Sequence, residues 1–318
     1  MSQNLPVVAP LERALYLRSL HWFRELSGRE LVILAQLMRE EWLRRGTVLL
    51  EAGQRVRAVH LVIEGTVRCE QDGHPCEQRD TSDAVGLLEL LADVESRARV
   101  SADTNVLALV IDGPALFDVI EDHFSLFLHL RAALGSAIQM LRATGGPENR
   151  PAPDAVADAA PAESAELDPV EQLIWLRRSL ELRAFGISVL PALIRAGGEI
   201  RLRSGEVLWE REAEPRFLAL VVRGAVACSG PGGTYRAGPG AVLGLEAVFC
   251  GLPHVEEARA VGEVVAIRID AAALLDVAED HFHVAARILA YAAGRIVAMR
   301  DQAPTAATAA GDAREAAA

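Results

Sequence analysis

The sequence is an internal duplication. Gly46 and Gly205 lie 159 positions apart (205 − 46), and Gly65 and Gly224 keep that offset (224 − 65). Further on, the string Glu-Asp-His-Phe at 121–124 recurs at 279–282, an offset of 158 (279 − 121). Loss of one residue in a loop explains the change, because loops tolerate deletions. The two copies must therefore adopt the same fold, and 318 residues suit two domains at the usual ~100–200 residues each.

Each copy reads as helices around a compact run of short strands. In the first copy, residues 11–22 predict a helix, and Ser27 with Glu30 forms a capping box that begins a second one. Short apolar segments punctuated by glycines follow, up to Ile111. Asp112 then stands at an N-cap position before a short helix and a longer one over 124–141. This order predicts a small barrel or jelly roll flanked by helices.

Composition divides the chain into five parts. We expect an N-terminal extension at 1–10, a first domain at 11–144 and a second domain at 169–301. Residues 145–168 are rich in Pro, Ala, Asp and Glu and contain no aromatic residue, which is typical of a flexible linker. The Ala- and Thr-rich stretch 302–318 predicts a disordered tail.

Charge and cysteine content narrow the classes of function. The net charge of −12 argues against binding to DNA or to an anionic membrane surface, since both need a positive footprint. The N-terminus lacks the pattern of a signal peptide, and no unbroken apolar run reaches the ~18 residues of a membrane span. Four cysteines in such a chain indicate reduced thiols and a cytoplasmic location.

The pattern resembles a known family. The first copy has Ile63-Glu64-Gly65-Thr66-Val67, then Gly86 with Leu90-Leu91, and Ile111-Asp112 at the end of the strands. The second copy repeats these in order, although Glu212 stands at the position of Gly53. Each copy thus resembles the cyclic nucleotide-binding domain family, the sensor domains of catabolite-activator type. The resemblance implies a mainly β fold with flanking helices: two jelly-roll (double-stranded β-helix) domains in tandem.

The resemblance also implies where a ligand would bind. In the family, a phosphate-binding cassette carries a Glu that accepts a bond from the ribose hydroxyl and an Arg that pairs with the cyclic phosphate. Here the Glu position holds Leu87 and Leu245, and the Arg position holds Ser96 and His254. Both cassettes are therefore interpreted as degenerate. The candidate ligand-binding residues are Gly86, Leu87, Leu88, Arg97 and Ala98 in the first copy and Gly244, Leu245, Glu246 and His254 in the second.

Loss of these groups disfavours ordinary cAMP or cGMP binding. Enclosing a phosphodiester without a paired cation costs roughly several kcal/mol, which helix N–H groups offset only in part. Two alternatives remain open. Arg97 stands one position late and could still reach a phosphate, and Glu246 is likewise one position late in the second copy. We expect no cofactor; the alternative is a sensor of a cyclic nucleotide or another small anion that uses Arg97.

Metal-binding and catalytic patterns are weak. Cys69, His74 and Cys76 could form a metal site on a hairpin, but the second copy repeats only the first of them, as Cys228. We interpret these cysteines as small buried hydrophobes. His281 and His283 begin a helix, where side chains two positions apart diverge. No catalytic spacing stands out, so we predict no metal and no enzyme.

The remaining prediction concerns partners. Helices 124–141 and 282–299 each carry a heptad-like apolar stripe, and in the family this helix is the usual dimer contact. We expect these helices to pair, either within one chain or between two chains. No effector domain is recognisable, so the chain is interpreted as a cytoplasmic regulatory or interaction protein that acts through a protein partner.

Overall fold

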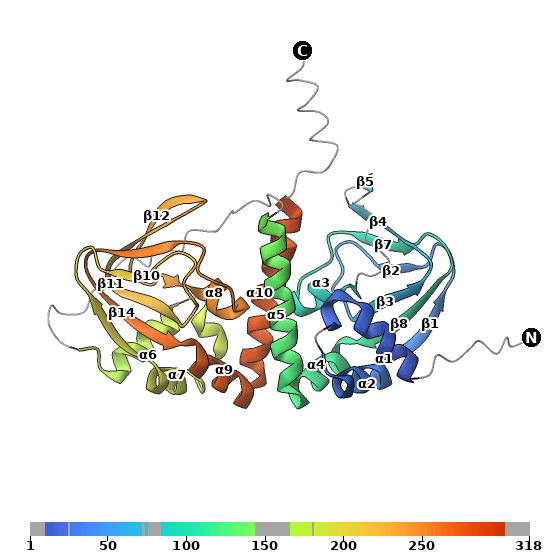
Figure 1. Ribbon diagram of the computed structural model, residues 1–318, viewed down its shortest axis with the longest axis horizontal. Coiled ribbons are helices and arrows are strands. Elements are labelled where there is room, and N and C mark those ends of the chain that lie inside the picture. Colours follow the sequence, from blue (N-terminus) through green and yellow to red (C-terminus); the bar gives the residue numbers. More distant parts are fainter. Residues whose placement is uncertain are drawn as a thin grey trace, which may run out of the picture. The chain divides into compact units, whose positions relative to one another are not determined.

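The computed structural model describes residues 10–24, 26–71, 74–75, 84–143, 166–179 and 181–302. Most of the expected linker, the tail beyond 302 and most of the N-terminal extension lie outside the described residues. By internal contacts the chain forms two units, residues 1–146 with 289–318 and residues 147–288 (Figure 1). The domain boundaries drawn from composition stay a prediction.

Three helical segments open the first copy. They are α1 (Pro10–Ser19), the 3₁₀ turn His21–Phe23 and α2 (Gly28–Leu37). The capping box is present, since the Glu30 amide donates to Ser27 Oγ at 3.3 Å and Glu30 Oε2 accepts from the Ser27 amide at 2.7 Å. The predicted face of α2 is buried, as its helical spacing requires: Leu31, Leu34 and Ala35.

The strands of the first copy form two four-stranded sheets. One has the order β1-β8-β3-β6 and the other β2-β7-β4-β5, with antiparallel pairing throughout. Their inward faces enclose an apolar core of Leu, Val and Ala side chains. The bounds are β1 (Arg39–Leu43), β2 (Val48–Leu50), β3 (Ala58–Glu64), β4 (Val67–Gln71), β5 (His74–Pro75), β6 (Ala84–Val85), β7 (Arg99–Ala102) and β8 (Val106–Asp112).

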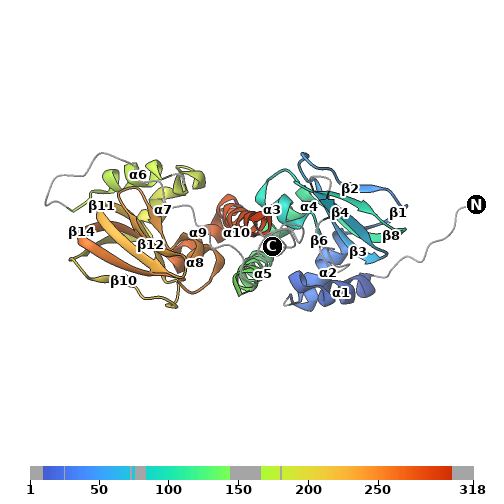
Figure 2. The same cartoon turned by 90° about the horizontal axis from the view of Figure 1, so that it is seen from above.

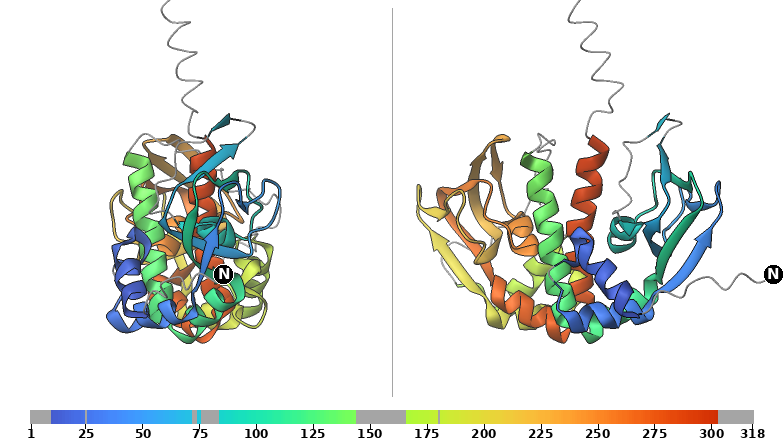
Figure 3. Two further views of the ribbon diagram at one scale, coloured as in Figure 1. Left: turned by 90° about the vertical axis from the view of Figure 1, so that its right-hand side faces the viewer. Right: turned by 45° about the vertical axis from the view of Figure 1, so that its right-hand side comes forward.

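Three more helices complete this copy. The short α3 (Leu87–Ala92) lies between β6 and β7, and α4 (Gly113–Asp122) and α5 (Phe124–Ala143) follow the last strand. Asp112 is the N-cap residue of α4, but its side chain makes no capping bond; it pairs instead with Arg39 at 2.9 Å. Figure 3 shows α5 in green as one unbroken helix.

The second copy repeats this order, with longer strands. The 14-residue strands β11 and β14 each run continuously where the first copy has two strands, and they pair with each other through irregular steps near Arg223. Helices α6 and α7 lie next to each other beside the strands (Figure 2). The bounds are α6 (Pro169–Arg178), the 3₁₀ turn η2 (Leu182–Phe185), α7 (Leu190–Ala196), β9 (Gly198–Leu202), β10 (Val207–Trp209), β11 (Phe217–Gly230), β12 (Gly233–Ala237), β13 (Val242–Leu243), α8 (Leu245–Cys250), β14 (Glu257–Asp270), α9 (Ala271–Asp280) and α10 (Phe282–Gln302).

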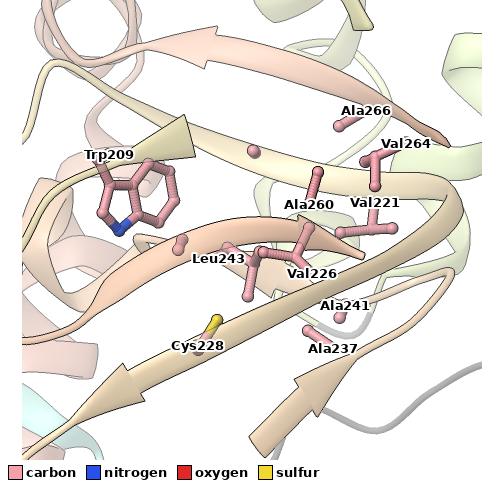
Figure 4. Close-up of a cluster of buried hydrophobic side chains, with 12 residues drawn as sticks. Trp209, Val221, Val226, Cys228, Ala237, Ala241, Leu243, Ala260, Val264 and Ala266 are labelled. Carbon is pink, nitrogen blue, oxygen red and sulfur yellow. The ribbon is translucent and has the colours of Figure 1, made fainter. Parts of the chain in front are cut away.

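Small side chains fill most of the second roll. Ala, Val and Leu residues from β11, β12, β13 and β14 face one another across its interior (Figure 4). Trp209 is the only aromatic ring among the buried members of this cluster in the described part of the chain, and it enters from β10. The expected jelly-roll architecture is therefore confirmed for both copies.

The cysteines divide into two kinds. Cys228 and Cys250 are buried free thiols, as expected. Cys69 is disulfide-bonded, so the expectation of reduced thiols is wrong for this residue. The hairpin residues Cys76 and His74, considered above as metal ligands, lie outside the described side chains.

Among the residues that the structure describes, two helices are long and apolar enough to cross a membrane by length and composition alone. They are Phe124–Ala143 and Phe282–Arg300, each with a mean hydropathy of 1.3 over an 18-residue window. Buried core helices have the same composition, and Phe127, Leu130 and Leu134 of α5 are buried. The absence of a membrane span stays a prediction.

One turn shows how the second copy tolerates a lost glycine. Gly53 has φ = 77°, and Glu212 at the equivalent position has φ = 64°. A side chain at residue 53 would meet no atom within 4 Å, so the left-handed backbone, rather than crowding, is the source of strain.

We predict that Glu212→Gly raises the free energy of unfolding by about 0.5–1 kcal/mol, because glycine adopts this conformation without strain. Urea unfolding measures the change. Glu214→Gly is the control, since this exposed neighbour has an ordinary φ and should lose stability through chain entropy. Equal effects of the two substitutions would contradict the assignment of strain to residue 212.

Glu30 links α2 to α5, and its ionisation should contribute to stability. Burial alone would raise its pKa, but hydrogen bonds from Ser125 and Ser27 and the charge of His129 lower the pKa below the ordinary 4.5. The stabilisation is therefore present above pH ~4.5 and is lost as pH falls through the folded-state pKa.

We predict that Glu30→Gln lowers the free energy of unfolding at neutral pH and flattens its decline between pH 5 and 3, which urea titrations at several pH values will measure. The exposed Glu121→Gln is the matched control. A decline in Glu30→Gln as steep as that of the wild type would show that other carboxylates carry it.

Candidate functional site

The first cassette begins at a glycine that the backbone requires. Gly86 has φ = 89° and forms the N-cap of α3. A Cβ at this position would lie 2.8 Å from Val56 Cγ1 and 3.1 Å from the Ala58 carbonyl oxygen. The turn from β6 into α3 therefore needs both left-handed backbone and an absent side chain.

The position that the resemblance assigns to an acidic residue is apolar and buried. Leu87 is 1% exposed and Leu88 4% exposed. Their side chains are part of the core of the first domain, so neither offers an acceptor to a sugar hydroxyl. Glu89, two positions later, is itself buried within α3.

The residues that follow α3 alternate between the inside and the outside of the roll. Ser96 is 1% exposed and its hydroxyl donates to the Ala98 carbonyl oxygen at 2.7 Å. Ala98 is also buried, whereas Arg97 and Arg99 are exposed. Arg99 lies 3.4 Å from a carboxylate oxygen of Glu51. Arg97 thus sits on the outward side of a segment whose inward positions are taken by Ser96 and Ala98.

The second cassette has the same backbone turn, but different side chains are buried around it. Gly244 has φ = 74° and forms the N-cap of α8, followed by Leu245 at 6% exposure. Glu246 is 1% exposed and His254 is 4% exposed. Both cassettes therefore place their candidate residues around one turn, but His254 rather than an arginine occupies the end of the loop.

An aromatic stack fills this site. The rings of Trp209 and His254 lie parallel, with centroids 4.1 Å apart and an interplanar angle of 8°. Phe217 contacts Trp209 edge-on at 5.6 Å. A Cβ at Gly244 would lie 3.1 Å from both Trp209 Cη2 and His254 Cε1, so the stack lies directly against the cassette turn. Trp209 Nε1 is buried and has no hydrogen-bond partner among the described residues.

Little space remains beside the stack. The hollow lined by residues of α8 and the loop after it, including Glu246 and His254, has a volume of about 10 Å³. That is about the space of a single water molecule. A hollow of this size is far too small for a cyclic nucleotide.

Trp209 lies at the candidate site, but the sequence patterns did not single it out. The signal was present, because its equivalent in the first copy (209 − 159) is Leu50, which also packs near the cassette glycine. Trp209 in the second copy thus replaces Leu50 of the first copy at the end of a short strand, and this difference indicates that the two rolls are filled by different side chains.

No group of three or more His, Cys, Asp or Glu side chains suited to a metal occurs in the described part of the chain. The ring centroids of His281 and His283 lie 5.8 Å apart, and His283 Nε2 contacts the Phe185 carbonyl oxygen at 2.8 Å.

Comparisons with solved structures give several matches. The regulatory domain of Toxoplasma gondii PKA with cAMP is 15% identical, with 89% of this chain and 95% of that chain covered and a TM-score of 0.33. The regulatory subunit of a cAMP-independent protein kinase A from Trypanosoma brucei is 17% identical, covering 85% and 84%, with a TM-score of 0.34. A Trypanosoma cruzi counterpart bound to guanosine is 16% identical, covering 85% of each chain, with a TM-score of 0.34. No curated protein matches the sequence.

Family comparison gives a match in each copy. The cyclic nucleotide-binding domain is found at residues 40–123 and again at 199–281. These ranges span the strands and the cassettes of both copies and together exceed half of the chain. The resemblance seen in the sequence is confirmed, and the chain belongs to the cyclic nucleotide-binding domain family.

Proposed function

We propose that this chain is a non-catalytic regulatory or interaction protein whose domains do not bind cAMP or cGMP in the usual way and which acts through a protein partner. The observation that carries the proposal is the stack of Trp209 on His254 against the second cassette. On this proposal, the stack takes up the space beside the cassette turn that a ligand would need.

Displacing the stack would be costly. Removing a buried Trp side chain from a packed core costs roughly 3–5 kcal/mol. The incoming phosphodiester would then meet no arginine at the end of the loop, because His254 stands there. A nucleotide would have to recover both costs from its remaining contacts. The stack therefore argues against a role for the second domain as a nucleotide receptor.

The first domain lacks the same two groups by a different route. Leu87 is buried at the acidic position, and Ser96 uses its hydroxyl within the loop. The alternative sensor that relies on Arg97 needs this side chain to reach inward, yet its neighbours on both sides occupy the inward positions. The outward direction of Arg97 therefore supports the partner-binding role over the sensor.

A purely regulatory role also agrees with the chemistry of the described residues. The buried polar side chains serve the fold: Glu30 caps α2, and Ser179 caps the turn before Leu182 at 3.3 Å. The predicted cytoplasmic location and the pairing of helices 124–141 and 282–299 belong to this proposal as well.

A panel of cyclic nucleotides tests the ligand part of the proposal. We expect no rise in melting temperature with cAMP, cGMP or their cyclic dinucleotide relatives at millimolar concentration. A ligand at 100-fold above its Kd would stabilise the protein by about 2.7 kcal/mol, which a thermal shift readily detects. Stabilisation that disappears in Arg97→Ala would instead establish the sensor.

The filling of the second roll gives a separate prediction. We expect Trp209→Leu, which restores the residue of the first copy, to lower the free energy of unfolding by about 2–4 kcal/mol through loss of the stack and creation of a cavity. Urea unfolding measures this loss. Trp42→Leu is the matched control, since Trp42 is 45% exposed and should lose far less. Equal losses would show that Trp209 does not fill the roll.

A further inference from the structure

The first helix of each copy exposes two apolar side chains at equivalent positions. Leu11 and Leu15 of α1 are 67% and 60% exposed, and Val170 and Ile174 of α6 are 64% and 46% exposed. The positions are equivalent by the duplication offset (170 − 11 = 159 and 174 − 15 = 159). Each pair is spaced four residues apart and lies on one side of its helix.

The inward sides of these helices are already occupied. Leu17 of α1 and Leu176 of α6 are fully buried. On another side of α1, Arg13 pairs with Glu40 at 2.7 Å and donates to the Met38 carbonyl oxygen at 2.8 Å. The apolar pairs lie on another side of these helices, and burial against the described residues does not explain them.

Two arginines accompany each apolar pair, again at equivalent positions. Arg18 and Arg24 in the first copy correspond to Arg177 and Arg183 in the second (177 − 18 = 159 and 183 − 24 = 159). All four are exposed, and none forms an ion pair within the part of the chain that the structure describes. We call each set the apolar–arginine face: Leu11, Leu15, Arg18 and Arg24, and Val170, Ile174, Arg177 and Arg183.

The second face continues into a hollow. A volume of about 610 Å³ is lined by Arg177, Arg183, Ala184, Ile187 and Leu190. Ile187 is 59% exposed, and it adds an apolar side chain to the lining of this hollow. In the first copy the equivalent of Ile187 is Gly28 (187 − 159), and a Cβ there would lie 3.7 Å from a guanidinium nitrogen of Arg18. The arginine of the first helix thus reaches the same point in both copies.

The chemistry of these faces selects one kind of occupant. Positions i, i+4 and i+7 of α1 and α6 carry two apolar side chains and then an arginine, which is the spacing of contact residues along one face of a helix that binds another protein. These guanidinium groups form no ion pair with the residues that the structure describes, and they suit carboxylates, which arginine binds in a bidentate way. The arginines form a local positive patch on a chain whose net charge is −12. The negative charge of the rest of the chain disfavours a nucleic acid or an anionic membrane as the occupant.

We propose that each apolar–arginine face docks an acidic amphipathic helix of a partner protein, with leucine-type side chains over the apolar pair and carboxylates on the two arginines. This inference rests on the protein-partner part of the proposed function and names the partner's chemistry. It is independent of whether the cassettes bind a nucleotide.

Fluorescence anisotropy of the full chain tests the proposal. The probe is a labelled synthetic helical peptide with Leu at i and i+4 and Glu at i+7 and i+8. The test variant carries Arg18→Glu, Arg24→Glu, Arg177→Glu and Arg183→Glu. The matched control carries the same charge change at other exposed arginines: Arg44→Glu, Arg45→Glu, Arg203→Glu and Arg236→Glu. Circular dichroism melting checks that both variants remain folded.

We expect the test variant to weaken peptide binding about tenfold or more, and the control to change it less than about threefold, since directly paired charges count for more than distant ones. Leu15→Asn with Ile174→Asn, and a peptide with Gln in place of Glu, should each weaken binding as well. Absence of peptide binding, or equal effects of the two arginine variants, would overturn the proposal.

Vesicles of phosphatidylglycerol and phosphatidylcholine form a second arm. Vesicle binding that needs the four arginines, without peptide binding, would assign the faces to a lipid surface and overturn the proposal. Stabilisation by a cyclic nucleotide alongside arginine-dependent peptide binding would overturn the ligand part of the proposed function alone.

Discussion

One backbone hydrogen bond recurs in both copies and holds the cassette end against the roll. In the first copy the Gly53 amide donates to the Ser96 carbonyl oxygen at 2.8 Å, and in the second the Glu212 amide donates to the His254 carbonyl oxygen at 2.7 Å. Both donors lie in left-handed turns. The bond uses only main-chain atoms. It therefore persists although Glu212 replaces a glycine and although Ser96 and His254 stand where the family has an arginine. The shape of the cassette is therefore set by backbone geometry, and its side chains are free to diverge.

That separation supports the proposal that this binding fold has lost its ligand groups and kept its architecture. The groups that recognise a nucleotide contribute little to the core, whereas Leu87 and Trp209 add apolar area where charged groups would otherwise have to be hydrated or paired. In the second domain the change goes further, because the stack of Trp209 on His254 uses the space itself. A domain of this kind gains packing at the expense of a binding cavity.

Much of the fold followed from the sequence, and the reasons are local. The Ser27–Glu30 capping box and the start of the long helix at Phe124 depend on neighbouring residues, so pattern alone predicts them. The duplication then carried each assignment from one copy to the other.

The prediction was weaker where a residue's role depends on distant partners. Asp112 was placed correctly at the start of α4, but Arg39, far away in sequence, takes its carboxylate. Trp209 was overlooked because only the closed roll brings it against His254. The disulfide of Cys69 was missed for a related reason. The number of cysteines in the whole chain does not determine whether one particular cysteine is oxidised.

Repetition of the apolar–arginine face has a consequence for stoichiometry. A chain that carries two equivalent faces offers two sites per molecule, so a partner with two acidic helices joined by a linker gains avidity, while a partner with one helix is bound in a ratio of two to one. The two faces also differ in detail, since Ile187 borders the second and Gly28 the first. Unequal affinities at otherwise equivalent sites would let a single chain respond to partner concentration in two steps.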